Sequence, residues 1–76
     1  MRHEYCEKDG IRVTYNDENI AFEDMSTAEA LVVANDGTVL IDNFGAAQTA
    51  QLMAWFEHIK GGIAYFRSLD RLEMAS

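Results

Sequence analysis

The sequence predicts one α+β domain, residues 1–76, in which an antiparallel sheet of four or five short strands (residues 3–42) packs against one long helix (about 46–60). Three observations predict this fold. Turn-forming residues divide the first half at regular intervals, and apolar residues alternate with polar ones between them, which is typical of strands with one buried face. The apolar period changes to that of a helix after residue 46. A chain this short has no room for a second domain.

The first three strands are predicted from alternation and turns. Lys8-Asp9-Gly10 separates His3–Glu7 from Ile11–Tyr15, and the polar turn Asn16–Asn19 separates the latter from Ile20–Glu23. In the second and third of these segments every other residue is large and apolar. One face of each strand should therefore be buried under the helix.

Residues 26–34 admit two interpretations. Ser26-Thr27-Ala28-Glu29 matches a capping box, which favours a short helix. Leu31–Val33 is rich in β-branched residues and leads into the turn Asn35-Asp36-Gly37, after which Thr38–Ile41 again has strand character. Two such runs around an Asp-Gly turn indicate a hairpin. The hairpin is the favoured prediction, and the helix is the alternative.

The second half is predicted to be helical from about residue 46. Gly61-Gly62 is expected to end this helix, because glycine is favoured just beyond helix ends. Residues 63–74 are expected to form a second short helix, with an edge strand as the alternative. The apolar residues that carry the helical spacing of the first helix are Ala46, Ala47, Ala50, Leu52, Met53, Phe56 and Ile59.

The formal net charge of −7 lies entirely in the first half. Residues 1–42 contain ten acidic and three basic residues, whereas residues 43–76 contain three of each. A negative surface repels phosphate backbones and attracts basic surfaces at a distance. We therefore expect no direct nucleic-acid binding, and a partner protein with a basic surface, such as a nucleic-acid-processing complex. The carboxylates are expected to gather on one outer face or edge of the sheet.

No catalytic or metal-binding pattern is present in the sequence. His3, Glu4 and Cys6 are close together, but the spacing of a zinc site is absent. Cys6 near His3 or His58 is a conceivable nucleophile, yet so short a chain rarely builds a pocket that encloses a substrate. The sequence therefore predicts a non-enzymatic protein with no metal and no cofactor.

Two groups of residues are the candidate partner-binding sites. One is a set of acidic residues that could imitate the phosphates of a nucleic acid. The other is a pair of aromatic residues that could be partly exposed, since tryptophan and tyrosine are frequent in binding hot spots. The candidates are Asp17, Glu18, Glu23, Asp24, Asp36 and Asp42 in the first group, and Trp55 and Tyr65 in the second.

The single cysteine and the absence of a long apolar segment predict a cytoplasmic protein without a membrane anchor. In size, acidity and lack of catalytic residues the chain resembles small inhibitors encoded by bacteriophages and mobile elements, such as anti-CRISPR and anti-restriction proteins. This resemblance of composition implies an inhibitor that blocks a basic nucleic-acid-binding surface. The alternatives are an antitoxin or immunity-type partner of a basic toxin, and an assembly subunit that forms a homodimer through its aromatic patch.

Overall fold

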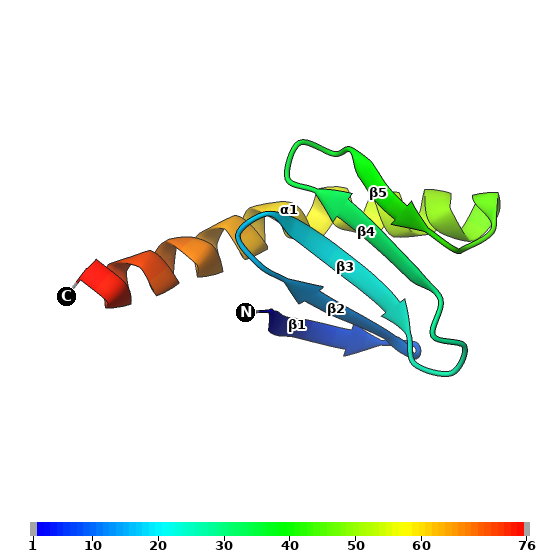
Figure 1. Ribbon diagram of the computed structural model, residues 1–76, viewed down its shortest axis with the longest axis horizontal. Coiled ribbons are helices and arrows are strands. Elements are labelled where there is room, and N and C mark those ends of the chain that lie inside the picture. Colours follow the sequence, from blue (N-terminus) through cyan, green and yellow to red (C-terminus); the bar gives the residue numbers. More distant parts are fainter. Residues whose placement is uncertain (1, 76) are drawn as a thin grey trace.

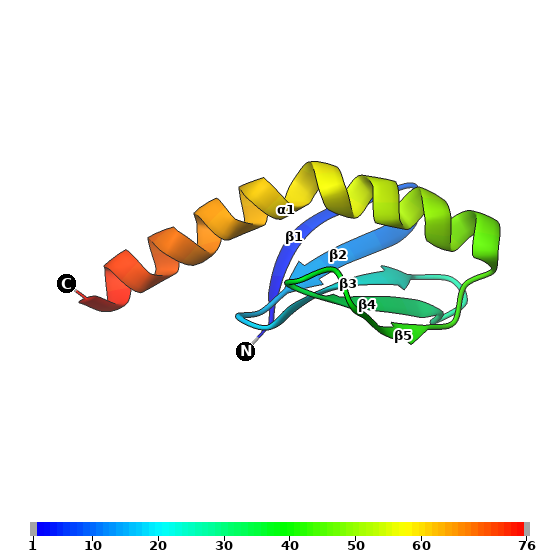
Figure 2. The ribbon, with the colours of Figure 1, turned by 90° about the horizontal axis from the view of Figure 1, so that it is seen from above.

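The computed structural model describes the backbone of residues 2–75 and the side chains of residues 2–69. It confirms the predicted α+β fold, with a five-stranded antiparallel sheet in the order β1-β2-β3-β4-β5 and one long helix on one of its faces (Figures 1 and 2). Every strand pairs with its neighbours in the sequence. The elements are β1 (His3–Lys8), β2 (Ile11–Tyr15), β3 (Asn19–Asp24), β4 (Ala30–Ala34), β5 (Val39–Asp42) and α1 (Ala46–Ala75).

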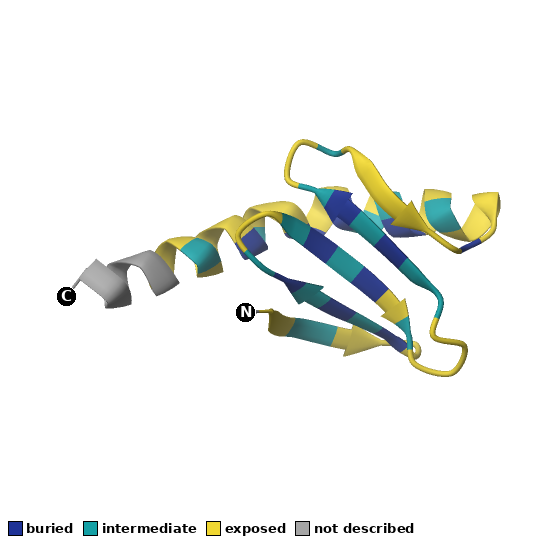
Figure 3. Cartoon of the chain, in the orientation of Figure 1, coloured by how far each residue is buried: buried dark blue, intermediate teal, exposed yellow. Residues whose placement is uncertain are grey.

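The core lies between α1 and the central strands. Alternate residues of β2, β3 and β4 are buried against the helix, as Figure 3 shows, and in β2 and β3 this is the alternation from which the strands were predicted. The helix contributes apolar residues at helical spacing from the same side. The buried residues are Ile11, Val13, Tyr15, Ile20, Phe22, Leu31, Val33, Phe44, Leu52, Phe56, Ile59 and Ile63. Within the described residues, no helix is both long enough and apolar enough to cross a membrane.

The hairpin interpretation of residues 26–42 is confirmed by the pairing of β4 with β5. The alternative helix at Ser26 does not form, and the two N–H groups of its capping box bond to other residues, that of Ser26 to Asp24 and that of Glu29 to the hydroxyl of Thr27. The carboxylate of Asp24 accepts hydrogen bonds from the backbone N–H groups of Ser26 and Thr27, at 2.8 and 3.3 Å. Ala28 then has a φ of 64°, in the left-handed region that interrupts a helix.

Gly61 and Gly62 do not end the helix, contrary to the prediction from the sequence. The backbone of α1 continues without interruption from Ala46 to Ala75, so that residues 63–74 belong to the same helix. Gly62 has a packing function instead. A Cβ atom at this position would lie 2.7 Å from the hydroxyl oxygen of Tyr5, whereas a Cβ at Gly61 would meet nothing within 4 Å. The missing side chain lets β1 and α1 approach each other.

The two glycines therefore predict opposite effects of the same substitution. Gly61→Ala should stabilise the protein by about 0.5–1 kcal/mol, because alanine is the better helix former. Gly62→Ala should lose this gain and lower the melting temperature, because the new methyl group displaces the rigid ring of Tyr5. Thermal unfolding followed by circular dichroism measures both variants. Equal stabilisation by both would show that the Tyr5 contact is unimportant.

Candidate binding surface

The structure divides the acidic residues of the sheet turns into two groups at opposite ends of β3–β5. Asp17 and Glu18 lie in the β2–β3 turn beside the β4–β5 turn that contains Asp36, and the side-chain amide of Asn35 donates a 2.8 Å hydrogen bond to the carbonyl of Asp17. Antiparallel pairing brings the second group together at the other end. This second group consists of Asp24, Glu29 and Asp42.

Three of the predicted acidic residues also stabilise the fold locally. The hydroxyl and the backbone N–H of Ser26 bond to the carboxylate of Asp24, and these bonds lower the pKa of Asp24 below its usual value. The N–H of Thr38 donates to Asp36 and likewise lowers the pKa of that carboxyl group. Asp42 accepts bonds from the N–H of Phe44 and the hydroxyl of Thr49, and so fixes the start of α1.

These lowered pKa values predict a loss of stability in acid. A carboxyl group whose pKa is lower in the folded chain stabilises it above the unfolded-state value of about 3.9, and this stabilisation disappears as the pH falls through the folded-state pKa. Asp24→Asn/Asp36→Asn should therefore be less stable than the wild type at neutral pH, and the difference should shrink as the pH falls below the unfolded-state value and through the folded-state pKa values. Urea unfolding at several pH values measures it. A difference in stability between variant and wild type that stays constant with pH would contradict the role assigned to Asp24 and Asp36. Asp17→Asn/Glu18→Gln is the control, because it also removes two acidic charges from turns of the sheet.

Of the two expected arrangements, one face or one edge of the sheet, the structure does not show the first. The outward positions at the centre of β3 and β4 are held by small or apolar residues, among them Ala21 and Val32, which line a shallow concavity of about 330 Å³ on the face without the helix. Glu23 is on this face, but it is the cross-strand partner of Arg12. The Nε atom of Arg12 also forms an ion pair with the carboxylate of Glu4 at 3.1 Å. The geometry of this pair is not that of a hydrogen bond. This face is thus apolar at its centre and mixed in charge at its border.

Neither β4 nor β5, nor the turn between them, contains a lysine or arginine. The sequence contains no lysine or arginine between residues 13 and 59. Arg2 and Arg67 reach the β2–β3 turn, where Arg2 bonds to the side chain of Asn19 and Arg67 to the carbonyl of Asn16, at 2.7 and 2.8 Å. Within the side chains of residues 2–69, neither Asp36 nor Asp42 has an ion-pair partner. The negative charge is therefore least compensated along the β4–β5 side of the molecule.

The strand between these two carboxylates is exposed and apolar. Val39, Leu40 and Ile41 are 44%, 54% and 50% exposed, and β5 is an edge strand with β4 on one side only. Three consecutive apolar residues at an edge are unusual, since edges are normally protected by charge. Sequence reasoning predicted the strand but missed this surface. The available signal was the lack of polar alternation in residues 39–41. We call Val39–Ile41 with Asp36 and Asp42 the β5 surface.

The two predicted aromatic residues lie in different environments. Trp55 is half-buried and its ring packs on that of Phe22, with centroids 5.5 Å apart. It therefore packs at the edge of the hydrophobic core. Tyr65 is 60% exposed and contacts Phe66, whose ring also meets Tyr5. The structure therefore places Tyr65 on the surface, on α1, apart from the β5 surface.

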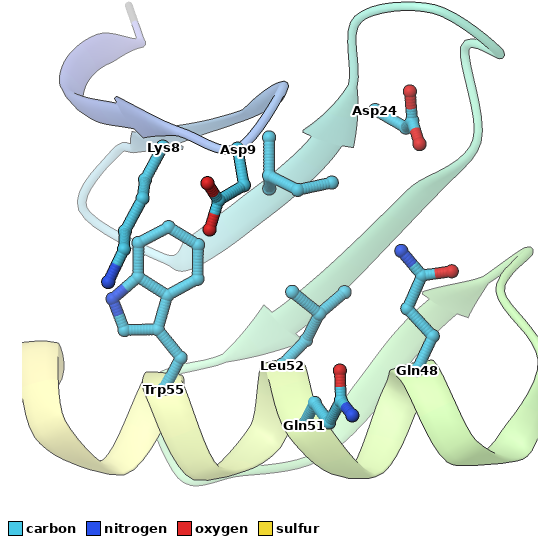
Figure 4. Close-up of a pocket in the computed structure, with 8 residues that line it drawn as sticks. Lys8, Asp9, Asp24, Gln48, Gln51, Leu52 and Trp55 are labelled. Atoms are coloured by element: carbon cyan, nitrogen blue, oxygen red, sulfur yellow. The ribbon is translucent and has the colours of Figure 1, made fainter.

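An open cleft of about 400 Å³ between the β1–β2 turn and α1 is drawn in Figure 4. Lys8 lies beside the indole ring of Trp55 there, and Asp9 and Asp24 supply its carboxylates. No hydroxyl, thiol or imidazole group is among the eight residues that line it. The cleft can hold a small polar group, and the charged side chains that line it are Lys8, Asp9 and Asp24.

The reactive side chains singled out from the sequence lie elsewhere. Cys6 is half-buried on β1, and burial, followed by the charge of Glu4, raises the pKa of its thiol. The thiol form is thus favoured over the nucleophilic thiolate at neutral pH. Among the described residues, no three histidine, cysteine or acidic side chains are placed to hold a metal ion.

The chain was compared with protein families, curated proteins and solved structures, and it matches none of them.

Proposed function

We propose that this chain is a non-enzymatic binding protein whose partner presents a basic surface. The observation that carries the proposal is the distribution of charge on the sheet. Carboxylates lie at both ends of β3–β5. Arg2 and Arg67 bond to the β2–β3 turn, whereas Asp36 and Asp42 have no ion-pair partner among the side chains of residues 2–69. A field of this sign accelerates the approach of a positively charged protein.

The kind of partner follows from the same field. A basic groove that normally holds nucleic acid offers both the positive charge and the binding surface that such a protein could cover. We infer that the chain acts as an inhibitor of a nucleic-acid-processing complex, of the type found in phages and mobile elements. Its two acidic ends would replace phosphates at two places in the groove.

Capture from a bacterial lysate tests this function. Tagged wild-type protein is compared with Glu18→Gln/Asp36→Asn/Asp42→Asn. This variant removes one charge each from the β2–β3 turn, the β4–β5 turn and the end of β5, and each new side chain keeps one amide oxygen that can accept a hydrogen bond. The wild type should retain a basic nucleic-acid-binding protein at low salt and release it at high salt, because screening acts beyond about 8 Å at physiological ionic strength. The variant should retain much less.

A control of equal net charge separates local from global effects. Glu7→Gln/Asp9→Asn/Glu57→Gln also removes three charges, but from β1, its turn and α1. It should capture the partner as the wild type does. The proposal would be refuted if both variants lost partner capture equally, or if the amount captured did not depend on salt concentration. A captured toxin would favour the antitoxin alternative, and recovery of this chain alone would favour the self-associating subunit.

A further inference from the structure

We propose that β5 binds an extended segment of the partner as a sixth strand of the sheet, and that this segment is apolar at its centre with a lysine or arginine at each end. The inference rests on the proposed function and specifies how the basic partner is held. It concerns the β5 surface alone and requires no contribution from the aromatic residues of α1.

The edge strand offers the backbone groups that strand addition needs. β5 pairs with β4 on one side, and within residues 2–75 no strand pairs with its other side. Alternate N–H and C=O groups along that side are therefore available to an added strand, which is a recurring mode of peptide recognition. A bulge between the Val32 and Val33 pairings adds twist, so the added strand can pair over only a few residues.

The opposite edge of the sheet lacks these properties. β1 contains His3, Glu4, Glu7 and Lys8, and its pairing with β2 is interrupted between Glu4 and Cys6. Charged side chains are a device by which edge strands avoid further pairing, whereas a register shift occurs at both edges and does not distinguish them. On β5 the side chains of Val39, Leu40 and Ile41 are exposed by about half. The difference between the two edges identifies β5 as the receptive one.

The flanking carboxylates define the chemistry of the occupant. Asp36 lies in the turn that precedes β5 and Asp42 is the last residue of β5, so a carboxylate stands at each end of the apolar residues Val39–Ile41. A segment laid along β5 meets apolar side chains at its centre and a carboxylate near each end. Two basic residues, one on each side of an apolar centre, fit this arrangement of charges.

A second copy of this chain is a poor occupant. Each copy has a formal net charge of −7. Antiparallel pairing of two β5 strands would place the end with Asp36 beside the end with Asp42 of the other copy, and parallel pairing would place Asp36 beside Asp36. Either arrangement brings like charges together, which costs free energy.

A panel of labelled synthetic peptides tests the inference. The first is acetyl-Lys-Thr-Val-Thr-Val-Thr-Lys-amide, the second has glutamate in place of both lysines, and the third has proline in place of the central threonine, which removes a backbone donor. Fluorescence anisotropy measures their affinity for the full chain. The lysine-ended peptide should bind at least tenfold more tightly than either of the others.

Two protein variants locate the binding. Ile41→Lys places a charge on the edge and should weaken binding of the lysine-ended peptide at least tenfold, whereas Leu69→Lys, at an exposed apolar residue of α1, should leave it unchanged. Absence of binding by every peptide, equal binding of all three, or a stable dimer in light scattering that Ile41→Lys dissociates would each overturn the inference. Failure of strand addition at β5 can be distinguished from failure of the proposed function. A salt-sensitive partner that Ile41→Lys still binds normally would refute strand addition alone.

Discussion

Replacement of Phe22 by alanine is expected to remove most of the stability of this protein. Phe22 is fully buried at the centre of β3 and packs on Trp55 from the helix. Truncation of a buried phenylalanine costs about 3–5 kcal/mol, since it removes apolar contacts and leaves a cavity. A domain of this length has a total stability of about 4–11 kcal/mol. Urea unfolding should therefore show a much lower midpoint, or a chain unfolded in water.

Phe66→Ala is the matched control for that experiment. Its ring is 43% exposed on α1 and contacts the neighbouring Tyr5 and Tyr65. The same change of side chain should cost much less here, about 1 kcal/mol. Similar losses for the two phenylalanines would contradict the position of the core between α1 and the central strands.

The second large effect is expected in the association rate with the captured partner. Glu18→Gln/Asp36→Asn/Asp42→Asn should lower this rate at least tenfold at low salt, because attraction between opposite charges raises association rates by about 10- to 1000-fold. The dissociation rate should change less, since exposed charges act mainly on the encounter. Stopped-flow measurement over a range of salt concentrations gives both rates.

The equal-charge variant Glu7→Gln/Asp9→Asn/Glu57→Gln decides how that result is interpreted. If net charge alone matters, both variants slow association equally. The distribution of basic residues predicts that this control slows it less than threefold, because Glu57 pairs with Lys60 and Glu7 lies opposite Arg12. Equal slowing would show that the β4–β5 side has no special part in the encounter.

The strands and the start of the helix were predictable because each depends on local pattern. In β2 and β3 the buried residues alternate without exception, from Ile11 to Tyr15 and again at Ile20 and Phe22. Both segments have two neighbours in the sheet and the helix on one face. The local signal and the tertiary environment therefore agree.

The end of the helix was not predictable, because the relevant contact is distant in the sequence. Gly61-Gly62 has the local signature of a helix end, but in the structure Gly62 lies within α1, where the hydroxyl end of the Tyr5 side chain of β1 occupies the space beside it. Nothing in the sequence near Gly62 reveals a contact with a residue 57 positions earlier. The same limit applies to Ser26, whose capping-box pattern is overridden by the carboxylate of Asp24.

The candidate site was predicted in its residues but not in its arrangement. All six acidic candidates lie on β3–β5 or their turns, yet turns project to the two ends of a sheet, while the outward positions between them are held by residues such as Ala21 and Val32. The exposed side chains of Leu40 and Ile41 escaped notice, since an apolar strand at an edge has the same sequence as one at the centre.

Hydrogen exchange in the complex with the captured partner tests most directly where the partner binds. On binding, the amides of β5 and of the β2–β3 and β4–β5 turns should exchange at least tenfold more slowly, because an added strand bonds the outer N–H groups of β5 and the basic surface covers the acidic ends. The amides of β1 should be unaffected. Protection confined to β1 or to the region of α1 around Tyr65, with β5 unchanged, would contradict the assignment of the binding surface.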